Sequence, residues 1–479
     1  MLRPAACAAA SGLLITAALL LISGCATPPP ADPVAALAKP SLLNKEYHAA
    51  MQELAQRPAN DEDANKALEK VIAGGIYTPP VREEALDLLA HRDLPRAKRT
   101  LRNTLPNTTA WAWLQRASAI IAERNWVDLT PALVSSWARP SILQTDDMQR
   151  PEYVSLAKLH GKDKVIDVVF DTFQSARETS QQGLRTRCWD LLYRLGQKDR
   201  LVALLNSADI PKDDTLLLDL QAAAHDLGVV AHNREEILWL RKLRLPEHAE
   251  FWSRATAAAQ DLSPARRAEL EIRDLPVMVS ASLHDPSLLT ASKDDLYRRV
   301  EAHVKAQNHH SQESNFEGFT GGKFERLGEF RELLTWGDLA AMLIAIRAMQ
   351  VPQVVEHLFD YAERDRADKS TEYGGVIALD DKDRFEIKEF PPVVREQDQK
   401  FLASQQMLDT AYTAIFHFHF HVQYIRNERF AGPGFGDVNY ADGTRANCLV
   451  FTSINENTMN VDFYRHDHVV VDLGEITRK

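Results

Sequence analysis

Three histidines alternate with phenylalanines near the end of the chain, at His417, His419 and His421. Because successive side chains of a strand point to opposite faces, this spacing places the three imidazoles on one face and the phenylalanines on the other. A phenylalanine face is typical of a buried core, whereas imidazole is a common metal ligand and proton carrier. The segment therefore predicts a metal site on a strand.

The surrounding sequence predicts a C-terminal α+β domain, residues 351–479, that would hold these histidines on a sheet. From Tyr373 onward, helical spacing of apolar residues gives way to short alternating or β-branched runs bounded by turn residues. A helix is expected at residues 397–412, directly before the histidine strand. The other predicted strands are residues 375–379, 385–390, 449–452, 459–464 and 469–473.

The order of these features resembles the JAB/MPN (JAMM) family of zinc metalloproteases. A predicted helix at residues 353–366 is followed by a Glu-Tyr-Gly-Gly run that begins at Glu372, then by the histidine strand, and later by a Gly-Phe-Gly-Asp run that ends at Asp437. The family shows Glu-x-small-Gly, then His-x-His, then Ser-x-x-Asp. The resemblance covers residues 353–473, about a quarter of the chain. It implies a JAMM-like fold with one catalytic zinc ion.

Taken residue by residue, the resemblance makes His419, His421 and Asp437 the zinc ligands and Glu372 the general base. Alternate residues of a strand can hold one ion together, and three protein ligands leave the fourth tetrahedral position open for water. Zinc lowers the pKa of that water to about 7, so that a nearby glutamate can take its proton. His417 and His419 form an equally spaced pair, which makes His417 an alternate ligand.

Two departures from the family pattern separate the expected fold from the expected activity. Residues 422–433 lengthen the connection after His421, and Gly434 stands where the family has serine. In the family that hydroxyl helps to stabilise the oxyanion, and losing one such donor costs about 10²–10³ in rate. A cupin barrel also uses His-x-His, but its glutamate follows closely, and Glu428 comes late for that role.

Two further histidine groups are predicted to be structural. His309 and His310 lie among loop-forming residues, before a glycine-containing stretch at residues 318–322, and we expect a solvated loop there. His466 and His468 flank Asp467 between two predicted strands, which indicates a hairpin tip.

Most of the chain before this domain has helical spacing. In residues 42–284, apolar residues recur at i, i+3, i+4 and i+7, with short polar or proline-containing breaks between the predicted helices. The rhythm of short paired helices resembles HEAT-type repeats, whose stacked helices form concave surfaces for partner binding. An irregular helical bundle is the alternative. Residues 285–350 are interpreted as a connecting region of helices and loops.

The N-terminus predicts export and a lipid anchor. An apolar run over residues 5–22 ends just before Gly24 and Cys25, which resembles the lipobox of bacterial lipoproteins. By that resemblance residues 1–24 are a signal peptide, Cys25 carries lipid, and Ala26 favours the outer membrane. Ordinary signal cleavage and an uncleaved anchor remain alternatives. The proline- and alanine-rich residues 25–41 would form a semi-rigid tether. No later run is apolar and long enough to span a bilayer.

Charge and cysteine content indicate which partners to exclude and which state of the cysteines to expect. The formal net charge of −11 argues against a nucleic acid partner, which needs a basic surface. Of the four cysteines, Cys7 leaves with the signal peptide and Cys25 carries lipid. Cys188 and Cys448 lie in different predicted domains, so we expect two buried free thiols instead of a disulfide framework.

Two functions follow from these patterns. One is a lipid-anchored lipoprotein of the bacterial cell envelope, facing the periplasm, with a zinc-dependent amide or isopeptide hydrolase domain of JAMM-like metallopeptidase type and a helical array that binds a protein or peptide partner. The other is a non-catalytic lipoprotein scaffold that binds a protein partner and carries a degenerate JAMM-like domain.

Overall fold

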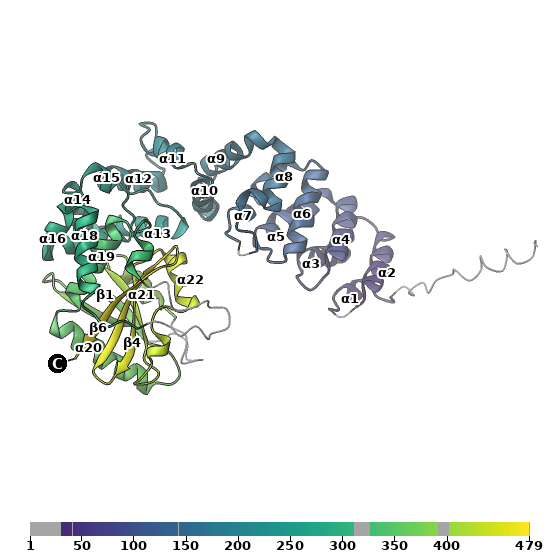
Figure 1. Ribbon diagram of the computed structural model, residues 1–479. Helices are drawn as coiled ribbons and strands as arrows, with labels where there is room; N and C mark the ends of the chain where they lie inside the picture. Colours follow the sequence, from purple (N-terminus) through teal and green to yellow (C-terminus); the bar gives the residue numbers. More distant parts are fainter. Residues whose placement is uncertain (1–29, 41, 142, 311–325, 391–401, 479) are drawn as a thin grey trace, which may run out of the picture. The chain divides into compact units, whose positions relative to one another are not determined.

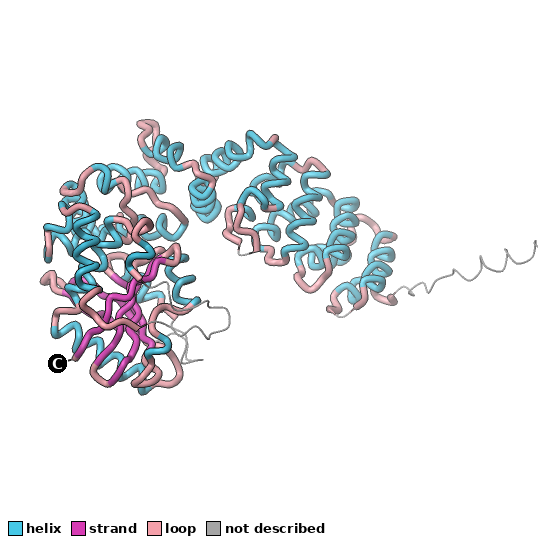
Figure 2. The backbone as a smooth tube through the Cα atoms, viewed as in Figure 1, coloured by secondary structure: helices cyan, strands magenta, loops and turns pink. Residues whose placement is uncertain are grey.

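The computed structural model describes residues 30–40, 42–141, 143–310, 326–390 and 402–478. It divides the chain into two compact units, Met1–Leu191 and Leu192–Lys479. Figure 2 shows helices in both units, and all the described strands belong to the second. The predicted signal peptide, Cys25 and the glycine-containing stretch at residues 318–322 lie outside the described residues.

The first unit is helical, as its apolar spacing predicts. Figure 1 shows its successive helices lying side by side, and α3 packs on α4 while α7 packs on α8. Pro79 and Pro151 open two of these helices, at a position where the missing N–H has no helical partner to lose. The helices are α1 Pro33–Leu37, α2 Asn44–Ala55, α3 Glu62–Ala73, α4 Pro79–Arg92, α5 Leu94–Thr104, α6 Trp111–Glu123, α7 Thr130–Trp137, α8 Pro151–His160, α9 Val165–Ser175 and α10 Gln182–Arg194, which contains the boundary between the units.

The predicted tether over residues 25–41 is corrected in its second half. Asp32 accepts hydrogen bonds from the backbone N–H groups of Val34 and Ala35, and this cap starts helix α1. Leu37 is buried where α1 packs on α2 and α3. An N-cap and the buried side chains of Ala36 and Leu37 therefore outweigh the proline content that indicated a semi-rigid tether.

The second unit contains helices and a sheet, so its limits differ from the division at residues 284 and 285 that the sequence suggested. Buried polar contacts join the helices to the sheet domain: Arg273 Nη1 donates to Asn447 Oδ1 at 2.7 Å, and Arg465 Nη2 donates to Asp338 Oδ2 at 3.0 Å. The helices of this unit are α11 Lys198–Leu205, α12 Thr215–Ala222, α13 Arg234–Leu243, α14 Ala249–Gln260, α15 Pro264–Arg267, α16 Asp274–His284, α17 Ser287–Thr290, α18 Lys293–Val304, α19 Trp336–Ala348, α20 Pro352–Ala367, α21 Gln405–Ala411 and α22 Phe435–Thr444.

Six strands form one mixed sheet in the order β2-β1-β3-β4-β5-β6. Neighbouring strands are antiparallel except β3 and β4, which are parallel. Each predicted strand is present, with the same or longer bounds, and the helix predicted at residues 397–412 is described as the shorter α21. The strands are β1 Gly374–Leu379, β2 Phe385–Phe390, β3 Phe416–His421, β4 Cys448–Asn455, β5 Thr458–Arg465 and β6 Val469–Thr477.

The two faces of the sheet are covered by different helices. On the phenylalanine face, the ring of Tyr361 in α20 meets that of Phe418 edge-on, with centroids 6.3 Å apart. On the histidine face, α21 packs on Val376 of β1 and α22 packs on Val450 of β4. The alternation of β3 thus separates an apolar core on one side from three imidazoles on the other, as predicted.

The prediction of two buried free thiols is also confirmed. Cys188 and Cys448 are buried free thiols. No single helix in the described part of the chain is long and apolar enough to cross a membrane; α19 and α20 meet that length and composition only as a pair, and they are bent by 86°.

Candidate metal centre

His419, His421 and Asp437 converge on one point at the histidine face of the sheet. The Nε2 atoms of the two histidines are 3.3 Å apart. Asp437 Oδ2 lies 3.2 Å from Nε2 of His419 and 3.5 Å from Nε2 of His421. Within the described residues, these three form the one group of His, Cys, Asp or Glu side chains close enough to share an ion.

The topology explains how Asp437 reaches the strand. Because β3 and β4 are parallel neighbours, the chain between them must cross back over the sheet, and such crossovers usually contain a helix. That helix is α22, which packs on β4 and carries Asp437 in its first turn. The N–H of Gly434 donates to Asp437 Oδ2 at 2.7 Å, so the start of the helix holds the carboxylate in place.

The ring nitrogens that face away from the centre have their own partners. Nδ1 of His421 donates to the carbonyl oxygen of Phe430 at 2.9 Å. Nδ1 of His419 lies 3.4 Å from the hydroxyl of Tyr464 on β5. A proton fixed on Nδ1 leaves the lone pair of Nε2 directed at the centre, which is how outer partners orient metal-binding histidines.

The charged groups of the cluster shift one another's pKa values. Burial acts to lower the pKa of His421, but the hydrogen bond and charge of Asp437, with the charge of Glu372, outweigh it and raise that pKa to about 9. Burial likewise acts to raise the pKa of Asp437, and the two imidazoles hold it well below its ordinary value. Because metal ligands bind in their deprotonated form, an ion here would compete with the proton of His421.

The three donor atoms fit a tetrahedral zinc ion. Zinc bonds of about 2.0–2.1 Å in a tetrahedron place neighbouring ligand atoms about 3.3 Å apart. The three measured separations between Nε2, Nε2 and Oδ2 are 3.2, 3.3 and 3.5 Å. Two imidazole nitrogens and one carboxylate oxygen are also a donor set that catalytic zinc sites use.

Glu372 stands beside this centre. Its side chain is 5% exposed, directly before β1, and its charge is one of the causes that raise the pKa of His421. Nε2 of Gln423 donates to Glu372 Oε1 at 2.9 Å. The structure therefore brings the three predicted ligands together, and Glu372 lies close enough for its charge to act on His421.

His417, the alternate ligand, points into different surroundings. It is buried, and its Nδ1 lies 2.8 Å from the hydroxyl of Tyr440. Burial lowers its pKa to about 4, so it is neutral at physiological pH. It does not belong to the group that could share an ion with Asp437.

The remaining histidine pairs are structural, with one difference from expectation. His309 and His310 follow α18 outside any helix or strand, but they pair with carboxylates of β6: His309 Nδ1 lies 3.0 Å from Asp472 Oδ2, and His310 Nε2 lies 2.8 Å from Glu475 Oε1. The register of β6 supplies these acidic partners, which local sequence does not reveal.

The hairpin tip at residues 466–468 is confirmed between β5 and β6, with Asp467 and His468 at positive φ. His466 is buried there, and its Nε2 lies 2.7 Å from Glu271 Oε2.

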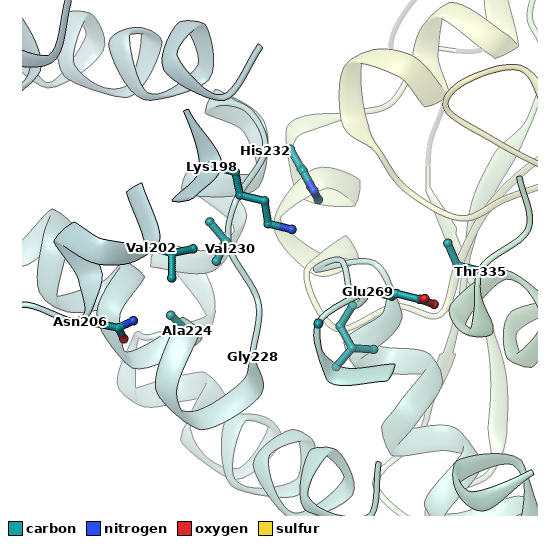
Figure 3. A pocket seen from close by; sticks show the side chains of 11 residues that line it. Lys198, Val202, Asn206, Ala224, Gly228, Val230, His232, Glu269 and Thr335 are labelled. Carbon is teal, nitrogen blue, oxygen red and sulfur yellow. The ribbon is translucent and has the colours of Figure 1, made fainter. Parts of the chain in front are cut away.

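The second unit also contains a cavity of about 520 Å³, which no sequence pattern indicates (Figure 3). Glu269 and Thr335 lie on one side of it, and Val202 and Asn206 lie on the other (Figure 3). None of the four candidate residues lines this cavity, so it is separate from the metal centre.

Comparison of the chain with protein-family models, with curated proteins and with solved structures gave no match. The chemistry of the centre therefore has to be argued from its own residues.

Proposed function

We propose that residues 351–479 form a zinc-dependent hydrolase of amide or isopeptide bonds, of JAMM-like metallopeptidase type. The observation that carries the proposal is the triangle of donor atoms of His419, His421 and Asp437, whose edges fit a tetrahedral zinc site, with Glu372 beside it. Three protein ligands are the number that leaves one position for water.

Each residue then has a separate task. A bound zinc ion would supply a Lewis acid for the scissile carbonyl and a water of lowered pKa. His419 and His421 present Nε2, and Asp437 adds a negative charge. Glu372 accepts the proton of the attacking water on its carboxylate and delivers it to the leaving amine. Gln423 orients that carboxylate through its amide.

Metal content tests the site. We expect about one zinc ion per chain in the lipid-free protein that starts after Cys25, and none in a His419→Ala/His421→Ala variant. His417→Ala is the matched control, since it removes a buried imidazole of the same strand face and should retain the metal. Loss of zinc in the His417 variant alone would overturn the assignment.

A second variant tests whether the centre hydrolyses amide bonds. Glu372→Gln keeps the shape of the side chain and should retain zinc while hydrolysis of blocked peptide amides falls by about 10²–10⁴. Equal hydrolysis by the two proteins would exclude Glu372 as the base.

The alternative is a lipoprotein scaffold with a degenerate centre, and Gly434 favours it because a glycine offers no side-chain donor to an oxyanion. Zinc binding without hydrolysis of any peptide amide would support this function. In both cases we propose that the first unit binds a protein or peptide partner, which the row of packed helices supports.

We further propose that lipid on Cys25 holds the protein at the bacterial outer membrane, on the periplasmic side. The apolar run before Gly24 supports this location. A Cys25→Ser variant should appear in the soluble periplasmic fraction instead of the membrane fraction.

A further inference from the structure

The exposed large apolar side chains of the C-terminal domain lie on the two segments that adjoin the predicted ligands in the chain. Among the described residues of 351–479, the large hydrophobic side chains that are exposed are Tyr424 (61%), Ile425 (42%) and Phe435 (67%). Tyr424 and Ile425 follow His421 by three and four positions, and Phe435 precedes Asp437 by two. We call these three residues the rim patch.

The loop that presents Tyr424 and Ile425 is fixed at both sides. Asn427 is 1% exposed, and its Nδ2 donates to the carbonyl of His421 and to Oε1 of Gln423, each at 3.0 Å. The N–H of Asn427 donates to the carbonyl of Ser453 on β4 at 2.8 Å. These contacts anchor the loop to the strand that carries the ligands.

The same loop touches the general base, because Gln423 donates to Glu372. Phe435 is the first residue of α22, whose first turn also carries Asp437. The rim patch therefore adjoins β3 and α22, the two elements that supply the three ligands, and its loop contacts the base.

Apolar side chains in water are unfavourable, and a group of them beside a site marks a surface that binds something. Aromatic residues are enriched in such surfaces. The residues of the rim patch lie on the loop that follows His421 and at the start of the helix that carries Asp437, while the rest of the domain's large apolar side chains are less exposed, and this favours the molecule on which the metal centre acts.

We propose that the rim patch binds a bulky apolar side chain of a peptide whose neighbouring amide bond lies at the metal centre. The substrate class is thus a peptide with an apolar residue next to the cleaved bond. This inference rests on the proposed function, which it makes more specific.

A lipid surface is the competing occupant, since the chain is expected to be lipid-anchored. Charge disfavours it, because positive and negative side chains balance around the patch. Lys369, whose ammonium lies 5.8 Å from the centroid of the Tyr424 ring, is matched by Glu372, which Gln423 contacts. Within residues 422–437, Arg426 and Arg429 are matched by Glu428 and Asp437, so no net positive charge attracts anionic lipids.

The test measures binding separately from turnover. The full lipid-free chain with Glu372→Gln would be titrated with a blocked, dye-labelled hexapeptide containing Leu-Phe, and with one containing Ser-Ser at the same positions. We expect the Leu-Phe peptide to bind at least 10-fold more tightly, and Phe435→Ser or a Tyr424→Ser/Ile425→Ser pair to remove that preference. Phe435→Leu should retain it to within about threefold, which separates loss of contact from loss of fold.

Leu333→Ser is the matched control, because Leu333 is similarly exposed (58%) but lies outside the domain's exposed set, and it should change nothing. Equal binding of the two peptides, or unchanged preference in the Phe435→Ser variant, would overturn the proposal. Loss of binding to vesicles of phosphatidylethanolamine and phosphatidylglycerol in these variants, with no peptide preference, would assign the patch to the membrane instead. A peptide preference without hydrolysis by the parent chain would leave the patch standing and refute the hydrolase.

Discussion

Two histidines on the same face of β3 differ sharply in their acid–base behaviour. Burial lowers the pKa of His417 to about 4, whereas the pKa of His421, also buried but next to Asp437, rises to about 9. A strand face therefore does not by itself make an imidazole a metal ligand. The carboxylate delivered by α22 decides which of the three histidines belong to the centre.

At Gly434 a single substitution would introduce the serine of the JAMM pattern that the sequence resembles. A Cβ atom there would meet Asp437 Oδ2 at 3.4 Å, an ordinary contact, and φ is −77°. We predict that Gly434→Ser folds normally, retains zinc, and raises the rate of peptide amide hydrolysis about 10–100-fold by adding an oxyanion donor. Steady-state kinetics would measure this. Gly436→Ser, at a position where a Cβ meets nothing within 4 Å, should leave the rate unchanged.

Asp274 makes the stability of the second unit depend on pH. Burial raises its pKa from 3.8 to about 7, so the folded state holds this proton more tightly than the unfolded state. Stability is therefore lost as pH rises from about 4 to 7, and it stays lost above that. We predict that Asp274→Asn stabilises the protein more at pH 8 than at pH 5, by roughly 2 kcal/mol. Urea unfolding at both pH values would show it, and an equal effect at both would contradict it.

At the scale of elements, close backbone packing joins β1 to its neighbours. A Cβ atom on Gly375 would lie 2.2 Å from the carbonyl oxygen of Lys388 on β2 and 3.1 Å from the ring of Phe418 on β3. We predict that Gly375→Ala costs about 1–3 kcal/mol in the free energy of unfolding, because the strands must separate. Thermal unfolding is the measurement. Gly443→Ala, in an open position of α22, should instead be neutral or stabilising by up to about 1 kcal/mol.

Some elements follow from sequence and others do not. Residues 385–388 and the histidine strand alternate, so β2 and β3 were predictable. Helix α22 was not, since residues 435–444 contain two glycines and lack apolar periodicity. It forms in the crossover between parallel strands and packs on the sheet. Asp437 was found only through the family resemblance.

Local sequence patterns also do not predict which residues contact the metal ligands. Tyr464 and Phe430 approach His419 and His421 through the sheet and through a loop, and neither has a sequence feature that marks it. The family resemblance predicted the ligands, whereas the residues that orient them are apparent only from the fold.

For the whole molecule, a buried charge network ties the helices of the second unit to its sheet. Asp338 is fully buried and accepts from Arg273 Nη1 at 2.8 Å and from Arg465 Nη2 at 3.0 Å. These contacts between distant segments place α16 and α19 in one unit with the sheet. A division based on local composition could not detect them.

We predict that Asp338→Asn destabilises the second unit by about 3–5 kcal/mol, because two buried guanidinium groups lose their shared counter-charge. Denaturant unfolding would give the value. Asp360→Asn is the control: Asp360 pairs with Arg478 at the surface, and its loss should cost no more than about 1 kcal/mol. Equal costs would mean that the network does not hold the unit together.

The alternation of β3 also restricts how the length of this chain can change. Removing or adding one residue inside Phe416–His421 would turn the imidazoles toward Tyr361 and the phenyl rings toward Asp437, which would destroy the core and the metal centre together. Residues 422–433 belong to no strand, so a change of length between Gln423 and Asn427 would not reverse the two faces of β3. The proposed substrate preference and the proposed zinc site should therefore respond differently to insertion and deletion, because one resides on a loop and the other on a strand of fixed alternation.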